Sequence, residues 1–114
     1  MSEIQGIARF TFHEGDVEEF KRLSAQVIDI VRAKDTGTLR YEIYFNDDQS
    51  ESVVYERYRD SEAVIEHAAH VGDLMAAIFA TASVSSELLG DPSAGLTAMT
   101  AGSGVSLFRP FLSM

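Results

Sequence analysis

The segment Glu51–Leu74 constrains the fold of this chain more than any other, because its hydrophobic pattern changes from a strand period to a helical period within a few residues. The strand portion alternates with period two, which places Glu56 and Tyr58 on one face. Nine residues after Tyr58, the helical portion carries His67, one of only three histidines in the chain. This junction of strand and helix is therefore the first place to look for chemistry.

Similar patterns run along the rest of the chain. They predict strands over Ile4–Phe12, Leu39–Phe45, Val53–Arg59, Val84–Leu89 and Val105–Phe111, and helices from Val17 to just before Thr36, from Asp60 or Ser61 to Phe79, and over Ser93–Thr100. Asp16 is the expected N-cap of the first helix. We expect Gly37 to take the positive φ of a helix C-cap, and Gly72 to interrupt the second long helix before Asp73 restarts it.

The predicted order is β-α-β-β-α-β with a short terminal strand added. This order is typical of an α+β, ferredoxin-like fold, in which helices cover one face of an antiparallel sheet. The 114 residues suit a single domain, 1–114. Both sides of the central hairpin carry large side chains, for example Ile43 and Phe45 against Tyr44. We therefore expect the uncovered sheet face to form a homodimer.

Composition excludes several classes of protein. The chain has no cysteine, so disulfides, thiolate metal sites and a cysteine nucleophile are excluded. A net charge of −9 repels phosphate backbones, so nucleic acid is not an expected partner. No apolar run approaches the roughly 18 residues of a membrane span, and no secretory signal pattern is visible. We expect a cytoplasmic protein with no membrane partner.

His67 and Glu56 are the candidate catalytic residues. Imidazole titrates near neutral pH, so His67 suits a base or a substrate-binding group, and a structural histidine is the equally balanced alternative. Glu56 suits orienting His67 or bonding a substrate phenol. Its alternative is a cross-strand ion pair with Arg57 or Arg40.

The candidate substrate-binding residues are Tyr58, Arg9, Tyr41, Met75 and Phe79. Tyr58 is expected to face the pocket because it shares a strand face with Glu56. Arg9 suits an anionic intermediate, although a cross-strand salt bridge is the commoner role for such a residue. Met75 and Phe79 have a helical spacing that more often belongs to the core.

No cofactor or metal is expected. His67 and His70 lie three residues apart on one helix face, but no third ligand follows at a clear spacing, and metal sites usually need three or four. No glycine-rich dinucleotide motif or phosphate loop is present. Serine is common, but none lies in a G-x-S-x-G turn.

The strand end Glu56-Arg57-Tyr58, with the turn and the helix that brings His67, resembles the antibiotic biosynthesis monooxygenase family of dimeric α/β-barrel proteins. The turn at 89–93 and the ending at 105–110 are similar to that family as well. The resemblance implies a homodimer with a pocket between sheet and helices. It also implies oxidation of a small aromatic, quinol-like or polyketide-like substrate by molecular oxygen without flavin or metal. An electron-rich phenolate or enolate can itself pass an electron to oxygen, so the protein supplies a base, a dry cavity and charge stabilisation.

Two features separate the chain from the haem-degrading branch of that superfamily. Ala77 occupies the region of the axial histidine, and the first strand lacks the expected asparagine. Two further functions remain open on the same scaffold: a non-catalytic small-molecule binding protein, and a cofactor-free isomerase or cyclase that moves protons through His67.

Overall fold

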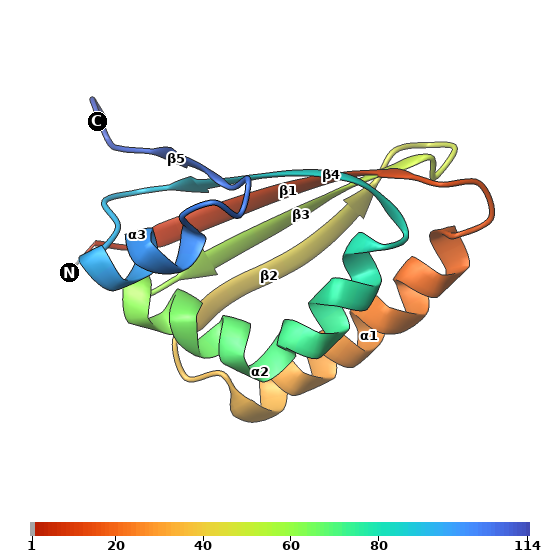
Figure 1. Cartoon of the computed structure of the whole chain (residues 1–114), viewed down its shortest axis with the longest axis horizontal. Coiled ribbons are helices and arrows are strands. Elements are labelled where there is room, and N and C mark those ends of the chain that lie inside the picture. The colour runs from red at the N-terminus through yellow and green to blue at the C-terminus, as the bar shows by residue number, and fades with distance from the viewer. Residues whose placement is uncertain (1) are drawn as a thin grey trace.

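The computed structural model describes residues 2–114 and confirms the α+β, ferredoxin-like order of elements (Figure 1). The strands are β1 (Ile4–Phe12), β2 (Thr38–Phe45), β3 (Glu51–Tyr58), β4 (Ala82–Leu89) and β5 (Ser106–Phe108). The helices are α1 (Val17–Lys34), α2 (Ser61–Phe79) and α3 (Ala94–Thr100). None of the helices described over this range is long and apolar enough to cross a membrane.

The strands form one sheet in the order β2-β3-β1-β4-β5. The first four pair antiparallel, whereas β5 pairs parallel with β4. The sheet is therefore mixed, whereas a fully antiparallel sheet was predicted. After β4 the chain crosses back through α3, so that β5 can run parallel to β4. Helices α1 and α2 lie on one face of the sheet, and α3 lies near the start of α2 on the same side (Figure 1).

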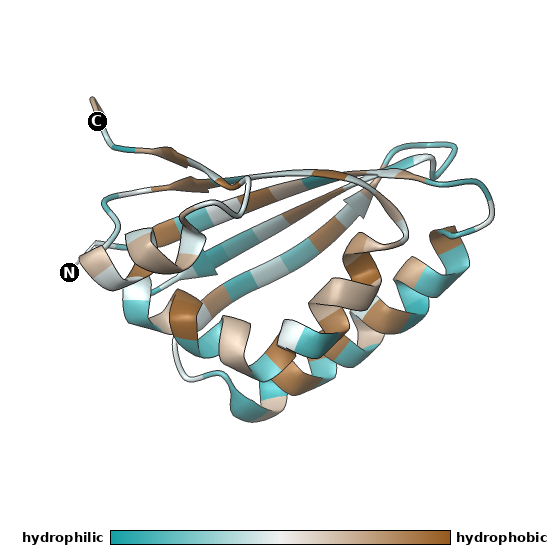
Figure 2. Ribbon diagram, in the orientation of Figure 1, coloured by the Kyte–Doolittle hydropathy of each residue, from teal (hydrophilic) through white to brown (hydrophobic). Residues whose placement is uncertain are grey.

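The main core lies between that sheet face and the two long helices. Alternate side chains of β1 and β3, such as Phe10 and Val54, point toward Phe20 and Val27 of α1 and Ile78 of α2. Figure 2 shows brown, hydrophobic segments on the parts of α1 and α2 that approach the sheet. The other face, here called the open sheet face, carries Ile7, Arg9, Tyr44, Val53 and Tyr55, and no element among the described residues covers it.

Two predictions about glycine were wrong. Gly37 does not have a positive φ; instead it is buried where the loop after α1 meets α2, and a Cβ there would lie 2.5 Å from the Cβ of Ala63. Helix α2 also runs without interruption through Gly72. The cost of an internal glycine is about 1 kcal/mol, and the burial of Val71 and Ile78 on either side holds the helix together.

The N-termini of the three helices are capped differently. Asp60 accepts a hydrogen bond from the Ala63 N–H at 2.9 Å, and Ser93 accepts one from the Leu96 N–H at 3.1 Å, as an N-cap does. Asp16 precedes α1 but makes no side-chain cap. The last strand is shorter than predicted, because only the three residues Ser106–Phe108 pair with β4.

Candidate functional site

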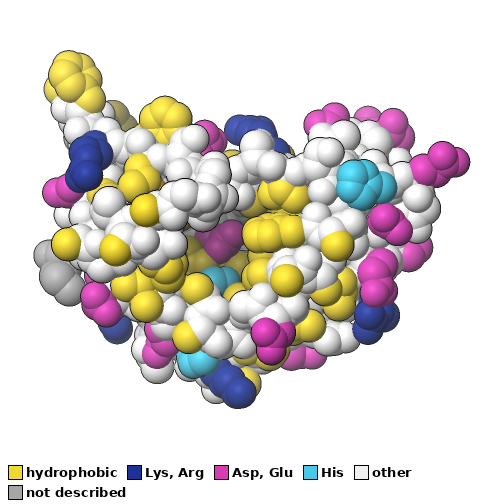
Figure 3. All heavy atoms as spheres, viewed as in Figure 1, with side chains coloured by type: hydrophobic (Ala, Val, Ile, Leu, Met, Phe, Trp, Pro, Cys, Tyr) yellow, Lys and Arg dark blue, Asp and Glu magenta, His cyan; other side chains and the backbone are white. Residues whose placement is uncertain are grey.

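An apolar cleft of about 290 Å³ opens between α2, the sheet and the segment that includes α3 and the residues after it (Figure 3). In the space-filling view, hydrophobic side chains surround a hollow in which an acidic and a histidine side chain are visible. The apolar walls include Val64, Ala68, Val71, Met75 and Phe79 from α2, Ala8 and Leu88 from the sheet, and Met99 and Val105 from the C-terminal part. The polar lining includes Glu56 and His67.

Small residues on β1 give access to Glu56. Gly6 lies directly opposite Glu56 in the β1–β3 register, and Ala8 follows on the same face. A Cβ at Gly6 would contact the Leu88 side chain at 3.4 Å and the Glu56 Cβ at 3.6 Å. The missing side chain therefore keeps the space beside the carboxyl group open.

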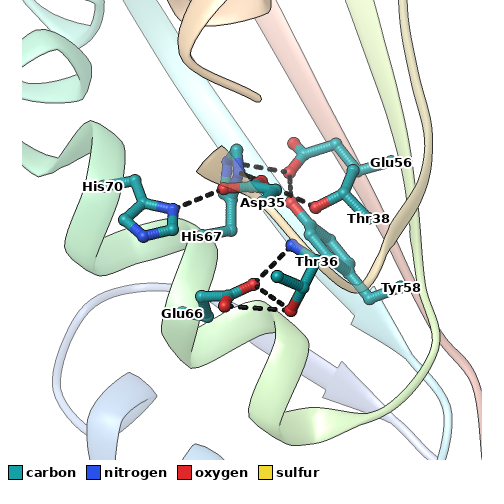
Figure 4. A network of polar contacts seen from close by, with 8 residues as sticks. All are labelled: Asp35, Thr36, Thr38, Glu56, Tyr58, Glu66, His67 and His70. Atoms are coloured by element: carbon teal, nitrogen blue, oxygen red, sulfur yellow. Dashed lines mark hydrogen bonds and ion pairs between the residues drawn. The ribbon is translucent and has the colours of Figure 1, made fainter. Parts of the chain in front are cut away.

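Asp35 orients His67. The Asp35 side chain is 1% exposed, and its Oδ2 lies 2.8 Å from His67 Nδ1 and accepts a hydrogen bond from Thr38 Oγ1 at 2.7 Å (Figure 4). Burial disfavours the ionised form of Asp35, but hydrogen bonds from His70, Thr38 and His67 outweigh it and lower the pKa of this carboxyl. Because an ionised carboxylate only accepts, Nδ1 of His67 carries the proton. Its Nε2 is then left to act as a base.

Glu56 lies on the other side of the His67 ring. His67 Nε2 is 3.9 Å from Glu56 Oε1, and the Tyr58 hydroxyl donates a hydrogen bond to the same oxygen. Burial is the largest influence on Glu56 and raises the pKa of its carboxyl, although the Tyr58 hydrogen bond and His67 oppose this. A base and a carboxyl with an increased tendency to hold a proton thus share one end of the cleft.

Tyr41 and Tyr58 support the site from behind. Their ring centroids lie 5.5 and 5.4 Å from that of His67, and neither lines the cleft. Burial, with smaller contributions from Glu56 and Asp35, raises the pKa of both hydroxyl groups, so both remain protonated. Tyr58 therefore contacts Glu56 directly but does not present its ring to the cleft as its strand register suggested.

The remaining candidates separate into two groups. Met75 and Phe79 line the cleft, as the substrate-binding prediction requires. Arg9 does not join them, because it is exposed on the open sheet face. The alternative pairing of Glu56 is also absent: Arg57 pairs with Glu3, and Arg40 with Glu42.

The two neighbouring histidines do not form a ligand pair, since His70 also turns its Nδ1 toward Asp35, at 2.6 Å from Oδ1 (Figure 4). A different group, Asp35, Glu66 and His70, has one ligand atom from each residue within 4.8 Å of the others. Glu66 instead accepts hydrogen bonds from the N–H and hydroxyl of Thr36. These residues bond to one another or to Thr36, an arrangement that explains their proximity without an ion.

Sequence reasoning missed Asp35. It follows α1 as the C-cap residue and lies 32 positions before His67. Acidic residues at the ends of helices are common, and no spacing linked this one to the histidines. Its burial results from the packing of the loop after α1 against α2.

The chain is similar in sequence and in fold to known proteins. The family model described as antibiotic biosynthesis monooxygenase matches residues 6–77. MupZ from Pseudomonas fluorescens superposes with a TM-score of 0.83 at 22% identity, covering 98% of this chain and 88% of MupZ. Rv0793 from Mycobacterium tuberculosis gives 0.69 at 27% identity, with 80% and 96% covered. SnoaB from Streptomyces nogalater, described as a cofactor-independent oxygenase, gives 0.67 at 22% identity, with 77% and 91% covered. No curated protein sequence matches the chain.

Proposed function

The chain belongs to the antibiotic biosynthesis monooxygenase family, and we propose that it is a cofactor-independent monooxygenase. Its substrate would be a small aromatic, quinol-like or polyketide-like molecule, oxidised by molecular oxygen. One observation carries the proposal: His67 has its Nδ1 held by buried Asp35, so that Nε2 is free beside Glu56 at the polar end of an apolar cleft.

The proposed roles follow from that geometry. His67 Nε2 takes the acidic proton of a bound phenol or enol, and the apolar walls keep water from competing for it. Asp35 stabilises the imidazolium that forms, as a carboxylate on the far nitrogen does. Glu56, when protonated, donates a hydrogen bond to the oxygen on which negative charge accumulates. Tyr58 positions Glu56 through the hydrogen bond to its Oε1.

Anthrone illustrates the balance of the reaction. Loss of a proton to His67 gives an enolate, which passes one electron to oxygen, and the resulting radicals combine to form a peroxide anion at the ring carbon. This anion takes the proton back from His67 and becomes a hydroperoxide. Loss of water from the peroxide leaves a carbonyl group. One oxygen atom stays in the product, the other leaves in water, and anthrone plus oxygen gives anthraquinone plus water without an external reductant.

Two facts about relatives support this assignment. The family is named for monooxygenases, and SnoaB is described as an oxygenase that needs no cofactor. The identity to SnoaB is 22%, a level at which the likeness establishes the fold. The chemistry of this chain therefore depends on its own cleft and has to be measured.

A homodimer through the open sheet face is part of the proposal. Ile7, Val53 and Tyr55 lie at the centre of that face and Tyr44 toward its edge, where the Tyr44 side chain is largely exposed. A second copy placed on this face would remove the apolar groups from water. The cleft lies on the other side of the sheet, so each subunit would keep its own site.

The test is oxygen uptake with hydroquinone and with anthrone, followed by mass spectrometry of products formed under ¹⁸O₂. We expect one labelled oxygen atom in each molecule of oxidised anthrone. His67→Gln removes the base while retaining a polar side chain, and should lower the rate by about 10²–10⁴. His13→Gln is the matched control, because His13 lies exposed in the turn after β1.

Other outcomes identify the competing functions. Binding of anthrone without oxygen uptake would support a binding protein. Exchange of its acidic protons with deuterated water, again without oxygen uptake, would support an isomerase or cyclase. Oxygen uptake at the wild-type rate in His67→Gln would remove His67 from the mechanism and leave Glu56 as the next candidate base.

A further inference from the structure

Gly72 lies in the interior of α2 without a structural reason to be glycine. Its φ is not positive, and a Cβ built there would have no heavy atom within 4 Å. Glycine in a helix interior is less stable than alanine because it loses more backbone entropy on folding. Neither a turn nor a close contact offsets that cost at this position.

The position of Gly72 points to space for a ligand. Ala68, Gly72, Met75 and Phe79 follow one another at intervals of four, three and four residues, so they share one face of α2. All four line the cleft. Gly72 is therefore a gap in an otherwise continuous row of side chains along one wall.

The open space continues beyond the end of this row. A second hollow of about 330 Å³ shares Phe79, Ser86, Ser103 and Val105 with the cleft, so the two form one groove that continues past the end of α2 beside β4. A cavity of about 150 Å³ is sufficient for benzene. At about 290 Å³, the cleft alone has room for more than one aromatic ring.

The charge of the lining restricts the ligand further. Of the described residues that line the cleft and the second hollow, none is lysine or arginine, whereas the acidic Glu56 is among them. A carboxylate or phosphate on the ligand would find no lysine or arginine to pair with, and a poorly paired charge is costly to bring into an apolar site. The groove thus favours uncharged molecules.

We propose that Gly72 determines the size of the ligand: a bare helix surface at this position lets an uncharged ligand larger than one aromatic ring lie along α2. That its hydroxyl end lies at Glu56 and His67 rests on the proposed function. The role of Gly72 does not require that a reaction occur.

The experiment measures binding without oxygen, so that no reaction is needed. Phenol and 1-naphthol are titrated anaerobically into wild type, Gly72→Ala and Gly72→Leu and followed by protein NMR shifts. Gly72→Leu should weaken 1-naphthol binding at least about tenfold, a difference of about 1.4 kcal/mol, and phenol binding much less. Gly72→Ala should show the same trend more weakly. Both should melt at or above the wild-type temperature, since both residues form helix better than glycine.

Gly95→Leu is the matched control, because Gly95 lies exposed in α3 and does not line the cleft. It should leave the binding of both phenols unchanged. The proposal is overturned if Gly72→Leu binds 1-naphthol as wild type does, if it weakens both phenols equally, if wild type binds neither, or if Gly72→Ala melts below wild type. If Gly72→Leu discriminates between phenol and 1-naphthol but the wild type takes up no oxygen, the proposed oxygenase function is refuted and the role of Gly72 stands. If the wild type takes up oxygen but Gly72→Leu does not discriminate, the role of Gly72 is refuted and the oxygenase function stands.

Discussion

Replacing Asp35 by Asn should cost more stability than any other change that removes a single charge from α1 or its end. The Asp35 side chain is 1% exposed and meets three groups: His67 Nδ1 at 2.8 Å, His70 Nδ1 at 2.6 Å and Thr38 Oγ1 at 2.7 Å. Asparagine retains the shape and one acceptor oxygen, but it loses the negative charge and turns an NH₂ group toward one histidine.

The magnitude follows from these contacts. A hydrogen bond to a charged group contributes about 1.5–3 kcal/mol, against about 0.5–1.5 kcal/mol for a neutral pair. Two histidine contacts therefore each lose about 1–1.5 kcal/mol, while the amide oxygen can still accept from Thr38. We expect the free energy of unfolding at pH 7 to fall by about 2–3 kcal/mol.

The loss should depend on pH in a defined direction. The pKa of Asp35 is lowered in the folded protein, so its charge stabilises the fold above the pKa of the unfolded chain, about 3.9. That contribution disappears as the pH falls through the lowered folded pKa. The difference in the free energy of unfolding between wild type and Asp35→Asn should therefore have its largest value at pH 7 and decrease as the pH falls below about 3.9.

Urea unfolding at pH 7 and pH 3 measures both quantities. Asp29→Asn is the control, because Asp29 is exposed on α1 and its substitution changes the net charge by the same amount. The reasoning fails if the two variants unfold at the same urea concentration at pH 7. It also fails if the deficit of Asp35→Asn is the same at both pH values.

Two further predictions concern packing and assembly. Gly37→Ala should destabilise the protein by about 1–3 kcal/mol in urea unfolding, because its Cβ would lie 2.5 Å from that of Ala63. Adding Ala63→Gly should restore most of the lost stability. If it does not, this contact is not the cause of the loss. Light scattering should give wild type about twice the 12.5 kDa of one chain and Val53→Asp a single chain, with Val53→Thr as the dimeric control. A wild-type mass of 12.5 kDa would contradict dimerisation through the open sheet face.

The sequence alone predicted the parts of the site that depend on local periodicity. Glu56 and Tyr58 were placed on one strand face, and His67 on the helix that follows, because each lies within a regular element whose period is short. The same alternation also placed Arg9 opposite Ala8 and Phe10, so its position on the open sheet face was already implied. A role for Arg9 in substrate binding at the cleft is not compatible with that alternation.

The parts that were missed depend on tertiary contacts. Asp35 acquires its role from a loop that packs on α2, and no local pattern reports a contact across 32 residues. The predictions for Gly37 and Gly72 rest on the conformational preferences of glycine. In the structure, Gly37 is glycine because α2 is too close for a side chain, whereas Gly72 has open space beside it. Local propensity describes what glycine permits but not which neighbour makes it necessary.

The sharing of one carboxylate by two histidines makes the orientation of His67 depend on a residue that does not line the cleft. His70 is 27% exposed, whereas the side chain of His67 is 8% exposed, yet each bonds a different oxygen of Asp35. Without His70, the Oδ1 atom of Asp35 would lose its partner, and the carboxylate could turn away from the position in which it holds His67. Solutes that bind His70 from outside would alter the base in the cleft without entering it.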